Sequence, residues 1–450
     1  MKKWIAALLC VILLMPAAIA EKYTSMPYWQ QIIQYEGMRE YLRDEVYVRC
    51  TYPDTRNEQI NREMGQLIDT MAEKGKSFLP EGHPKLMPAY LDVGSTVFHT
   101  GDRWMSFLTI ARIAAEREQI YLDFDARVYN IETGSRIYLS DLFAPDSPAW
   151  DILSLAVEEQ LIAYFSNEIP DEQTLALLCT RETLENTPFT LTPAKLSLHF
   201  RADQLYPGKH TMMHVNLYYP QIREYMTGAG QMITDNSNYK LIALTYDDGG
   251  ARGSSMNVID QLRKYGANAT FFIIGNKIYM NHDVISREHD AGYAVQSHNY
   301  EHVYNGITPE KVQYWKRKFD QALDSVIGQQ AIYMRAPGGN YKGFVKGNVG
   351  LPLIHWSAIS GDATSEEINA YSIALQVIAS AKDGGVVLLH DLNPLANQYS
   401  AIFLEELVKR GYLFVTVDEL FSHYGVVLEP NILYYSCEDI AEQQSKIPVP

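Results

Sequence analysis

The chain has 450 residues, of which 47% are hydrophobic and 20% are charged, and its formal net charge at pH 7 is −16. This composition is that of an ordered protein with enough apolar residues for more than one core, so two or three domains are expected. The acidic charge argues against a surface that binds polyanions, and nucleic acid is therefore not an expected partner.

The first 20 residues have the pattern of a secretory signal peptide. Lys2 and Lys3 precede an apolar run from Trp4 to Met15, and Ala18-Ile19-Ala20 forms a small-residue cleavage site. The run is too short to span a bilayer comfortably, so a secreted or envelope-associated protein without a stable transmembrane segment is expected. A retained N-terminal anchor is the alternative. Three cysteines follow the signal, and this odd number predicts neither a disulfide framework nor a cysteine metal site: Cys50, Cys179 and Cys437.

Residues 21–118 are predicted to form a first α+β accessory domain. Val46, Val48 and Cys50 alternate with polar residues, as in a half-buried strand. Two further strands, 90–99 and 104–110, flank Thr-Gly-Asp-Arg and predict a hairpin. One face of a helix lies between these strands in the sequence: Ile60, Met64, Leu67, Ile68 and Met71.

Residues 119–226 are predicted to form a second α+β accessory domain. Two strands surround the turn at Glu132-Thr133-Gly134-Ser135, and further strands are expected at 196–200 and 213–218. Residues 227–239 are polar, contain glycine and lack apolar periodicity, which predicts a linker. The helix of this second domain has an apolar stripe: Trp150, Leu153, Val157, Leu161 and Tyr164.

From residue 240 onward, short apolar strands alternate with amphipathic helices, as a parallel barrel requires. The first strand begins at Leu241 and ends in Asp247-Asp248-Gly249-Gly250. Adjacent carboxylates repel each other unless a cation or a proton-accepting role uses them, and a solvated turn is the alternative. A later helix carries an apolar stripe that predicts core rather than a cofactor site: Val312, Trp315, Phe319 and Leu323.

His298 and His302 lie four residues apart, which predicts that both rings share one face of a helical turn. Together with one aspartate they would form a three-ligand site with an open position, the pattern of a catalytic metal. A pair of histidines at this spacing is by itself usually a surface accident. The Asp-Asp pair before it, and the segments RAPGG (335–339) and LLHD (388–391) after it, favour the metal site.

Five segments in order, TYDDG, HNYEH, RAPGG, HWSAISGD and Leu388–His390, resemble the motifs of polysaccharide deacetylases, the fourth family of carbohydrate esterases. The resemblance covers about residues 241–423 and implies an α/β fold, a deformed (β/α) barrel with its site at the C-terminal ends of the strands. The catalytic domain is expected at 240–425, preceded by a mixed α+β accessory region and followed by a tail at 426–450.

The resemblance implies that Asp248, His298 and His302 hold a divalent metal ion. One oxygen and two nitrogen ligands suit Zn²⁺, with Co²⁺ and Mn²⁺ as alternatives. Asp247 would act as the general base, and His390 would protonate the departing amine.

Three further residues receive roles from the resemblance. Arg335 would orient the base, Asp362 would tether His390, and the amide of Gly338 would donate to the oxyanion. The alternatives are a surface ion pair for Arg335 and a helix N-cap for Asp362. The chain departs from the family pattern at four positions: Gly250 for proline, Asn299 for a hydroxyl residue, Gly338 for tyrosine and Ala363 for tryptophan.

These features predict a secreted, metal-dependent N-deacetylase of N-acetylated amino sugars in peptidoglycan. Chitin-type oligosaccharides or O-acetyl esters are alternative substrates, and a non-catalytic protein that binds or senses the wall is the alternative from another class. The strand pair around Thr133-Gly134 and the segment LSDLF resemble the accessory domain of some bacterial deacetylases and of lysozyme-sensing anti-sigma factors. A wall or protein partner for the accessory domains follows from that resemblance.

Overall fold

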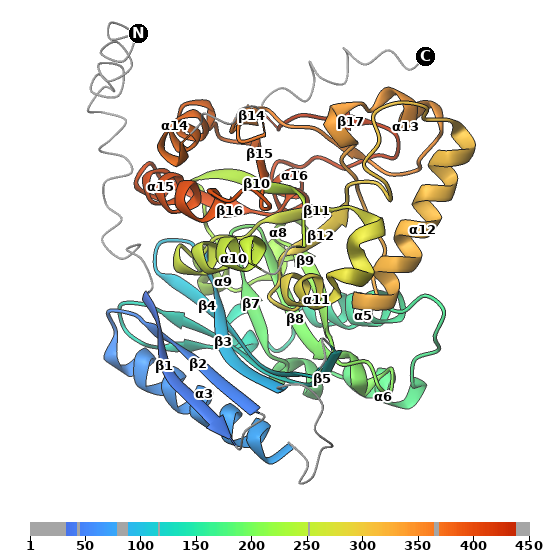
Figure 1. The fold of residues 1–450 in the computed structure, drawn as a ribbon. Coiled ribbons are helices and arrows are strands. Elements are labelled where there is room, and N and C mark those ends of the chain that lie inside the picture. The colour runs from blue at the N-terminus through green and yellow to red at the C-terminus, as the bar shows by residue number, and fades with distance from the viewer. Residues whose placement is uncertain are drawn as a thin grey trace, which may run out of the picture.

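The computed structural model describes residues 33–42, 46–78, 89–115, 118–250, 253–363 and 369–437. The predicted signal peptide, residues 1–20, and the end of the predicted tail, residues 438–450, lie outside the described residues. Among the described helices, none combines the length and the apolar character that a membrane crossing needs. Figure 1 shows an N-terminal sheet in blue and teal below a C-terminal barrel in yellow and red.

The N-terminal sheet is built around helix α3 (Glu58–Phe78), which connects two parallel neighbours, β2 and β3. The other neighbouring strands in this sheet are antiparallel. Ile60, Met64, Ile68 and Met71 of the predicted stripe are buried against the sheet, while Leu67 is partly buried. The order of the strands across the sheet is the same as their order in the sequence: β1 (Ile33–Leu42), β2 (Val46–Asp54), β3 (Ala89–Thr100), β4 (Trp104–Ala115), β5 (Glu118–Asn130) and β6 (Arg136–Ile137).

The predicted hairpin is confirmed, because Thr100 pairs with Trp104 across a turn that contains Gly101 at φ 56°. The expected boundary between residues 118 and 119, however, falls inside β5. This strand pairs with β4 along its length, so one sheet spans both expected accessory units. The other domain limits stay predictions.

A middle layer combines a three-stranded antiparallel sheet with short helices. The predicted stripe from Trp150 to Tyr164 is buried in the core of this layer. The sheet contains β7 (Phe189–Leu191), β8 (Lys195–Arg201) and β9 (Met212–Tyr218). The helices are α4 (Leu139–Leu142), α5 (Ala149–Ile162), α6 (Glu172–Leu178), α7 (Arg181–Asn186), α8 (Tyr219–Ile222) and α9 (Gly228–Ile233).

The segment predicted as a linker, residues 227–239, is folded and packed. Thr227 caps α9 by accepting a hydrogen bond from the amide of Gly230, and Ile233 is buried. The side chain of Asn236 accepts from the amide of Gly101 at 2.8 Å and donates to the carbonyl of Pro193 at 2.8 Å. Tertiary contacts therefore order a segment whose own sequence has no apolar period.

The barrel consists of parallel strands in the order β12-β11-β10-β15-β14, with β16 beside the first half of β10. Bridges at Ser297–Met334 and Met334–Leu353 carry the curve on to β13, from which the chain runs directly into β14. This arrangement is the expected deformed barrel. The strands are β10 (Lys240–Asp248), β11 (Thr270–Ile273), β12 (Ala294–Ser297), β13 (Leu353–Ile354), β14 (Ala358–Ile359), β15 (Gly385–His390), β16 (Tyr412–Val415) and β17 (Leu433–Tyr434).

Helices cover the barrel, and α12 shows how the sequence delimits them. Thr308 caps its start, Pro309 occupies the first turn, and Gly328 ends it at φ 73°. All four residues of its predicted stripe are buried, which confirms their place in the core. The helices are α10 (Ser254–Lys264), α11 (His282–Asp290), α12 (Pro309–Ile327), α13 (Lys342–Lys346), α14 (Ala370–Ser380), α15 (Ala396–Lys409) and α16 (Val417–His423).

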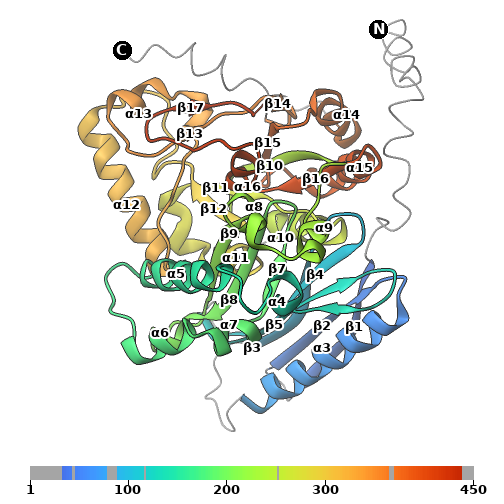
Figure 2. The ribbon, with the colours of Figure 1, turned by 180° about the vertical axis from the view of Figure 1, so that it is seen from behind.

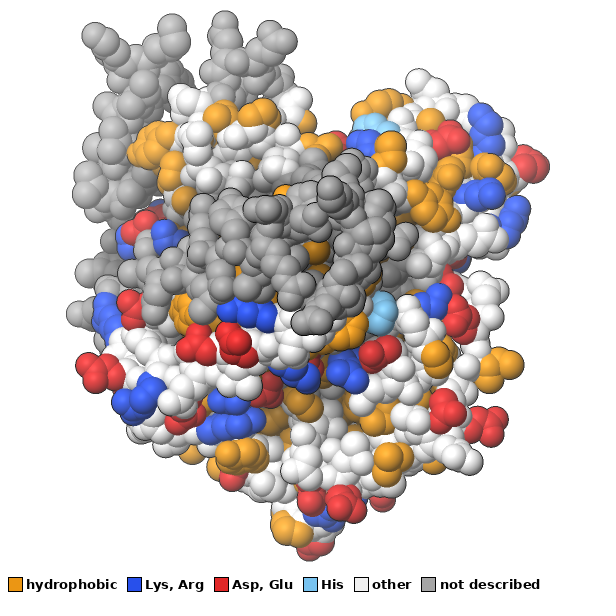
Figure 3. Space-filling view, turned by 60° about the horizontal axis from the view of Figure 1, so that its bottom comes forward, with side chains coloured by type: hydrophobic (Ala, Val, Ile, Leu, Met, Phe, Trp, Pro, Cys, Tyr) orange, Lys and Arg blue, Asp and Glu red, His pale blue; other side chains and the backbone are white. Residues whose placement is uncertain are grey.

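The middle layer packs on the barrel through α11 and α16, and the N-terminal sheet packs on it through α10 and through ion pairs to α11 (Figure 2). Asp290, at the end of α11, pairs with Arg112 of β4 at 3.4 Å and is fully buried. It also accepts from Thr211 Oγ1 at 2.7 Å and from the Met212 amide at 2.9 Å. Among the described residues visible in Figure 3, acidic and basic side chains are interspersed.

Candidate metal centre and active site

The predicted motifs meet at one end of the barrel because its strands are parallel. Asp247 and Asp248 end β10, and Asp247 stands in register with His390, the last residue of the neighbouring β15. His298 follows β12, two strands away on the other side of β10. This is the C-terminal edge of the strands, where a barrel of this kind carries its functional groups.

Asp248, His298 and His302 form a candidate metal site, with one ligand atom from each residue and all of these atoms within 4.8 Å of one another. Asp248 Oδ1 lies 3.6 Å from His298 Nε2 and 3.3 Å from His302 Nε2. Asp248 Oδ1 is buried and has no hydrogen-bond partner among the described residues. An orphaned carboxylate oxygen that faces two imidazoles is costly by itself, and a divalent cation would satisfy it.

His298 is prepared for this role by its surroundings. Its Nδ1 lies 3.0 Å from the carbonyl of Arg335, a contact in which the ring donates and which leaves Nε2 as the free nitrogen facing Asp248. Burial lowers the pKa of His298, which favours the neutral ring that binds metal.

The two histidines are brought together by an irregular loop, and the expected helical turn is wrong. Asn299 adopts φ 61°, outside the right-handed helical region, and its side chain donates to the carbonyl of Glu301 at 2.7 Å. The rings of His298 and His302 nevertheless lie 5.3 Å apart. Asp248 has φ 75°, a strained conformation of the kind that clusters at functional sites.

Asp247 lies beside the metal site and is held by a buried arginine. Arg335 Nη1 donates to Asp247 Oδ1 at 2.8 Å, and its side chain is only 1% exposed, which removes the alternative of a surface ion pair. The same nitrogen donates to Thr245 Oγ1 at 2.6 Å, and Nη2 donates to the carbonyl of His355 at 3.0 Å. The guanidinium also stacks over Phe272, 4.4 Å from the ring centre. Sequence reasoning did not single out Thr245, although its position two residues before Asp247 puts it on the same face of β10.

His390 is tethered by Asp362. Asp362 Oδ1 accepts from His390 Nδ1 at 2.8 Å, while Oδ2 accepts from the His390 amide at 2.8 Å and from Tyr399 OH at 2.9 Å. Both carboxylate oxygens of Asp362 are engaged in this tether. Glu366 and Glu367, before which the N-cap alternative places a helix start, lie outside the described residues. Tyr399 escaped sequence reasoning because it lies on a distant helix, α15, and follows no local motif.

The tether controls the proton on His390. Burial alone lowers the pKa of His390, but the hydrogen bond and charge of Asp362, together with the charges of Asp247 and Asp248, outweigh it and raise the pKa to about 9. The ring is therefore protonated at neutral pH. Conversely, burial raises the pKa of Asp362, whereas the contact with His390 outweighs this and keeps Asp362 ionised.

Gly338, at φ 59°, lies against Tyr304, because a Cβ at this position would be 2.6 Å from Tyr304 Cε1. The Tyr304 ring in turn contacts His302, with 5.0 Å between ring centres. The role of the Gly338 amide as an oxyanion donor stays a prediction. Gly250 has φ 91°, which proline cannot adopt, so this departure from the family pattern changes the loop after Asp248. Ala363 is exposed.

The chain is similar to a family model and to several known proteins. The family model for polysaccharide deacetylases matches residues 234–347. Peptidoglycan-N-acetylglucosamine deacetylase of Bacillus cereus is 31% identical over 198 residues, which are 42% of this chain and 91% of that protein. Peptidoglycan-N-acetylglucosamine deacetylase PgdA of Listeria monocytogenes is 29% identical over 322 residues, covering 69% of this chain and 67% of that protein.

Solved structures match over a smaller part of the chain. A family 4 acetyl xylan esterase from Clostridium thermocellum, in complex with a cobalt ion, has 27% sequence identity and a TM-score of 0.42, and the match covers 44% of this chain and 98% of that one. The Bacillus cereus relative is matched over nearly its whole length, and the family model covers the strand that ends in Asp247 and Asp248 as well as both histidines. The chain therefore belongs to the polysaccharide deacetylase family.

Proposed function

We propose that this protein is a secreted, metal-dependent N-deacetylase that removes acetyl groups from N-acetylated amino sugars of peptidoglycan. The observation that carries the proposal is the juxtaposition of Asp248, His298 and His302 with Asp247 on one side of the reacting position and His390 near it. These groups supply an electrophile site, a base and an acid, which amide hydrolysis needs together.

Zn²⁺ is the proposed ion, with Co²⁺ and Mn²⁺ as alternatives, since one carboxylate oxygen and two imidazole nitrogens fit each of them. When bound by Asp248, His298 and His302, a divalent ion supplies Lewis-acid polarisation of the acetamide carbonyl and lowers the pKa of water.

Asp247 is the proposed acceptor of the proton of the attacking water. Arg335 occupies its Oδ1, while Oδ2 lies 3.8 Å from His298 Nε2, on the side of the metal ligands. The arginine thus fixes the direction of the carboxylate and leaves one oxygen for the proton.

His390 is the proposed donor of a proton to the departing amine. Asp362 holds Nδ1, so Nε2 is the nitrogen that faces outward from the tether, and a pKa of about 9 keeps a proton on it at neutral pH. An amine cannot leave as an anion, so this proton is required in the transition state.

Relatives support the substrate class. Besides the two N-acetylglucosamine deacetylases, the N-acetylmuramic acid deacetylase PdaA of Bacillus subtilis is 26% identical over 191 residues. The basic, apolar and small-residue segments of residues 1–20 support secretion, and the N-terminal sheet and middle layer are proposed to associate with the wall or with a protein partner.

The test is acetate release by the purified protein from muropeptides, chitooligosaccharides and acetylated xylooligosaccharides, before and after chelation. We expect release from N-acetylated peptidoglycan fragments, about one divalent ion per chain by elemental analysis, and loss of turnover after chelation. Release from the other substrates alone would redirect the substrate assignment. No release from any of them by metal-loaded protein would support a non-catalytic role.

A further inference from the structure

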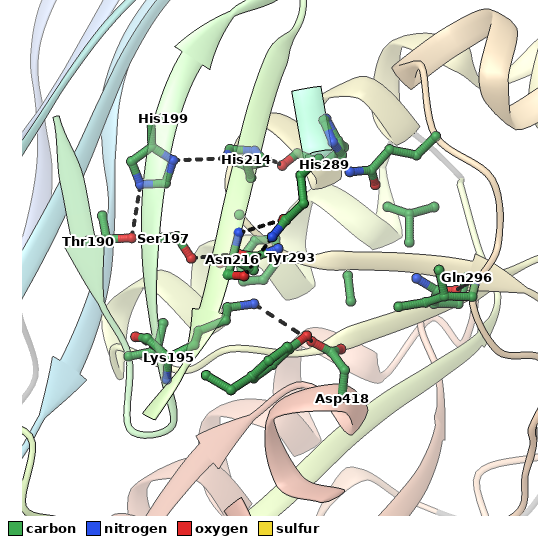
Figure 4. Close-up of a pocket in the computed structure, with 18 of the residues that line it drawn as sticks. Thr190, Lys195, Ser197, His199, His214, Asn216, His289, Tyr293, Gln296 and Asp418 are labelled. Atoms are coloured by element: carbon green, nitrogen blue, oxygen red, sulfur yellow. Dashed lines mark hydrogen bonds and ion pairs between the residues drawn. The ribbon is translucent and has the colours of Figure 1, made fainter. Parts of the chain in front are cut away.

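A cavity of about 550 Å³ lies between the middle layer and the barrel, and none of the candidate site residues lines it. Its walls come from α5, β7, β8 and β9 on one side and from α11, β12 and α16 on the other (Figure 4). Gln221, Gln330 and Ile332 line it and are exposed, so the cavity opens to solvent. Its volume falls within the range of about 300–1,000 Å³ that small-molecule sites have.

Several amide side chains in the wall have one polar atom held in a hydrogen bond and the other polar atom without a hydrogen-bond partner among the described residues. Gln296 Oε1 accepts from the amides of Ile332 at 2.9 Å and Tyr333 at 3.3 Å, and Asn216 Oδ1 accepts from Ser197 Oγ at 2.7 Å. The amide nitrogens of both side chains have no hydrogen-bond partner in the described part of the chain. They are donors whose direction is already fixed.

An acceptor and a further donor complete this set. Gln329 Nε2 donates to Tyr164 OH at 2.5 Å, which leaves Gln329 Oε1 as an acceptor without a partner among the described residues. At the rim, Gln221 Oε1 accepts from the Tyr218 amide at 2.8 Å, and its nitrogen is the remaining donor. An apolar occupant would leave these groups unpaired, which costs free energy.

The charged groups of the cavity compensate one another. Lys195 and Asp418 lie at one end, 3.9 Å apart, and three histidines lie at the other end (Figure 4). Neither an anion nor a cation would therefore find an unpaired partner of opposite charge in this pair.

Two of the three histidines at the other end, His199 and His214, are joined by a hydrogen bond between neutral rings. His214 Nε2 donates to the carbonyl of His289 at 2.9 Å, so its Nδ1 accepts from His199 Nδ1 at 2.8 Å, and His199 Nε2 accepts from Thr190 Oγ1 at 2.9 Å. Each contact is satisfied by neutral rings, and burial, with the charge of Lys195, lowers the pKa of His199 to about 3. The His199–His214 pair is therefore uncharged, with all four ring nitrogens in hydrogen bonds.

We propose that this cavity is a second ligand site that takes a neutral carbohydrate of one or two sugar rings. Sugar hydroxyls both donate and accept, which matches fixed amide donors beside an amide acceptor. Tyr218, which is half-buried in the wall, offers apolar ring surface to the C–H groups of a sugar. The inference depends on the groups of the cavity itself, and it holds whether or not the metal centre deacetylates a substrate.

The test measures binding of N,N′-diacetylchitobiose and maltose to the purified protein by isothermal titration calorimetry. The cavity variant is Ser197→Ala/Asn216→Leu, which removes both partners of one hydrogen bond and so leaves no orphaned polar group between them. His302→Ala, in the metal centre, is the matched control, since it leaves the cavity unchanged.

We expect at least one of the two sugars to bind the parent protein at millimolar concentration. The affinity of the cavity variant for that sugar should be lower by about tenfold or more. The affinity of the His302→Ala control should equal that of the parent protein. If thermal melting shows that the cavity variant is unfolded, Gln329→Leu at the half-buried wall replaces it, with the same expected loss. Failure of the parent protein to bind either sugar, or equal affinity in parent and folded cavity variants, would overturn the proposal.

Discussion

Asp247 and Asp248 are adjacent in the sequence but face different partners. Asp247 is held by Arg335 at 2.8 Å, whereas Asp248 Oδ1 faces His298 and His302. We expect Asp247→Asn to keep the metal and to lower kcat about a hundredfold or more, because it removes the proton acceptor. Asp248→Asn should instead weaken metal retention. Kinetics and elemental analysis of both variants check this, and exchanged phenotypes would reverse the two roles.

The contribution of His390 to catalysis is expected to depend on whether the leaving group needs a proton. His390→Ala should lower kcat/KM far more on an N-acetyl substrate than on an activated acetate ester, because the leaving group of the activated ester departs as a stable anion and needs no proton. The measurement compares both substrates in both proteins. Equal losses would mean that His390 stabilises the site without donating a proton.

Asp362 is expected to set the alkaline limit of activity. His390 has its pKa raised to about 9, so the protonated acid is present below that pH and is lost as the pH rises through it. Asp362→Asn removes the charge that favours the protonated ring, so the alkaline limb of the kcat/KM profile should move to lower pH. Ser360→Ala, which removes another partner of Asp362 and keeps the carboxylate, is the control and should shift the limb less. An unchanged limb in Asp362→Asn would assign the titration to another group.

At the scale of elements, the loop after β11 supports the loop that carries both histidines. The amides of Gly275 and Asn276 donate to the carbonyls of Asn299 and Tyr300, each at 2.9 Å. A Cβ at Gly275 would lie 2.6 Å from Tyr300 Cδ2 and 2.9 Å from the Tyr300 backbone. The two loops therefore approach too closely for any side chain at this position.

We expect Gly275→Ala to destabilise the protein by about 1–3 kcal/mol and to weaken metal retention, because the histidine loop must shift. Thr308→Ala, which only removes the cap of α12, should cost about 1 kcal/mol and leave metal content unchanged. Thermal melting and elemental analysis separate the two variants. Normal metal retention in Gly275→Ala would show that the histidine loop tolerates the displacement.

At the scale of the whole molecule, the accessory regions and the barrel are joined by a buried carboxylate. Burial alone would raise the pKa of Asp290, but the His289 contact, the Arg112 charge and the Met212 amide together hold it well below its ordinary value. A depressed pKa stabilises the fold above the unfolded value of about 3.9, and this stabilisation is lost as the pH falls further.

Asp290→Asn should therefore lower the free energy of unfolding at pH 7 by about 3–5 kcal/mol, because it leaves Arg112 buried without its charge partner. It should also reduce the loss of stability on acidification. Urea denaturation at pH 7 and at about pH 2.5, below the unfolded pKa, measures both effects. Asp320→Asn, at an i,i+4 pair on α12, is the control with an expected loss of at most about 1 kcal/mol. Equal losses in the two variants would contradict this account of Asp290.

The candidate site was predictable from sequence because its candidate ligands directly follow apolar strands. A short stretch of sequence is enough to recognise such a strand and the polar residues after it. A buried apolar run that ends in Asp247 and Asp248 indicates the end of a strand, and the spacing of His298 and His302 indicates that both bind one metal ion. The apolar stripes of α3, α5 and α12 predicted their buried faces for the same reason, since helical periodicity depends only on residues within a few turns.

Tertiary structure decided what depends on groups distant in the chain. The loop at Asn299 replaced the expected helical turn, and the carboxylate of Asp362 is bound to His390 and to Tyr399 of α15. The sheet that runs through residue 118 and the packed segment at 227–239 are held by pairings across long separations, which no local pattern encodes. The polar cavity arises in the same way, because it exists only where the middle layer meets the barrel.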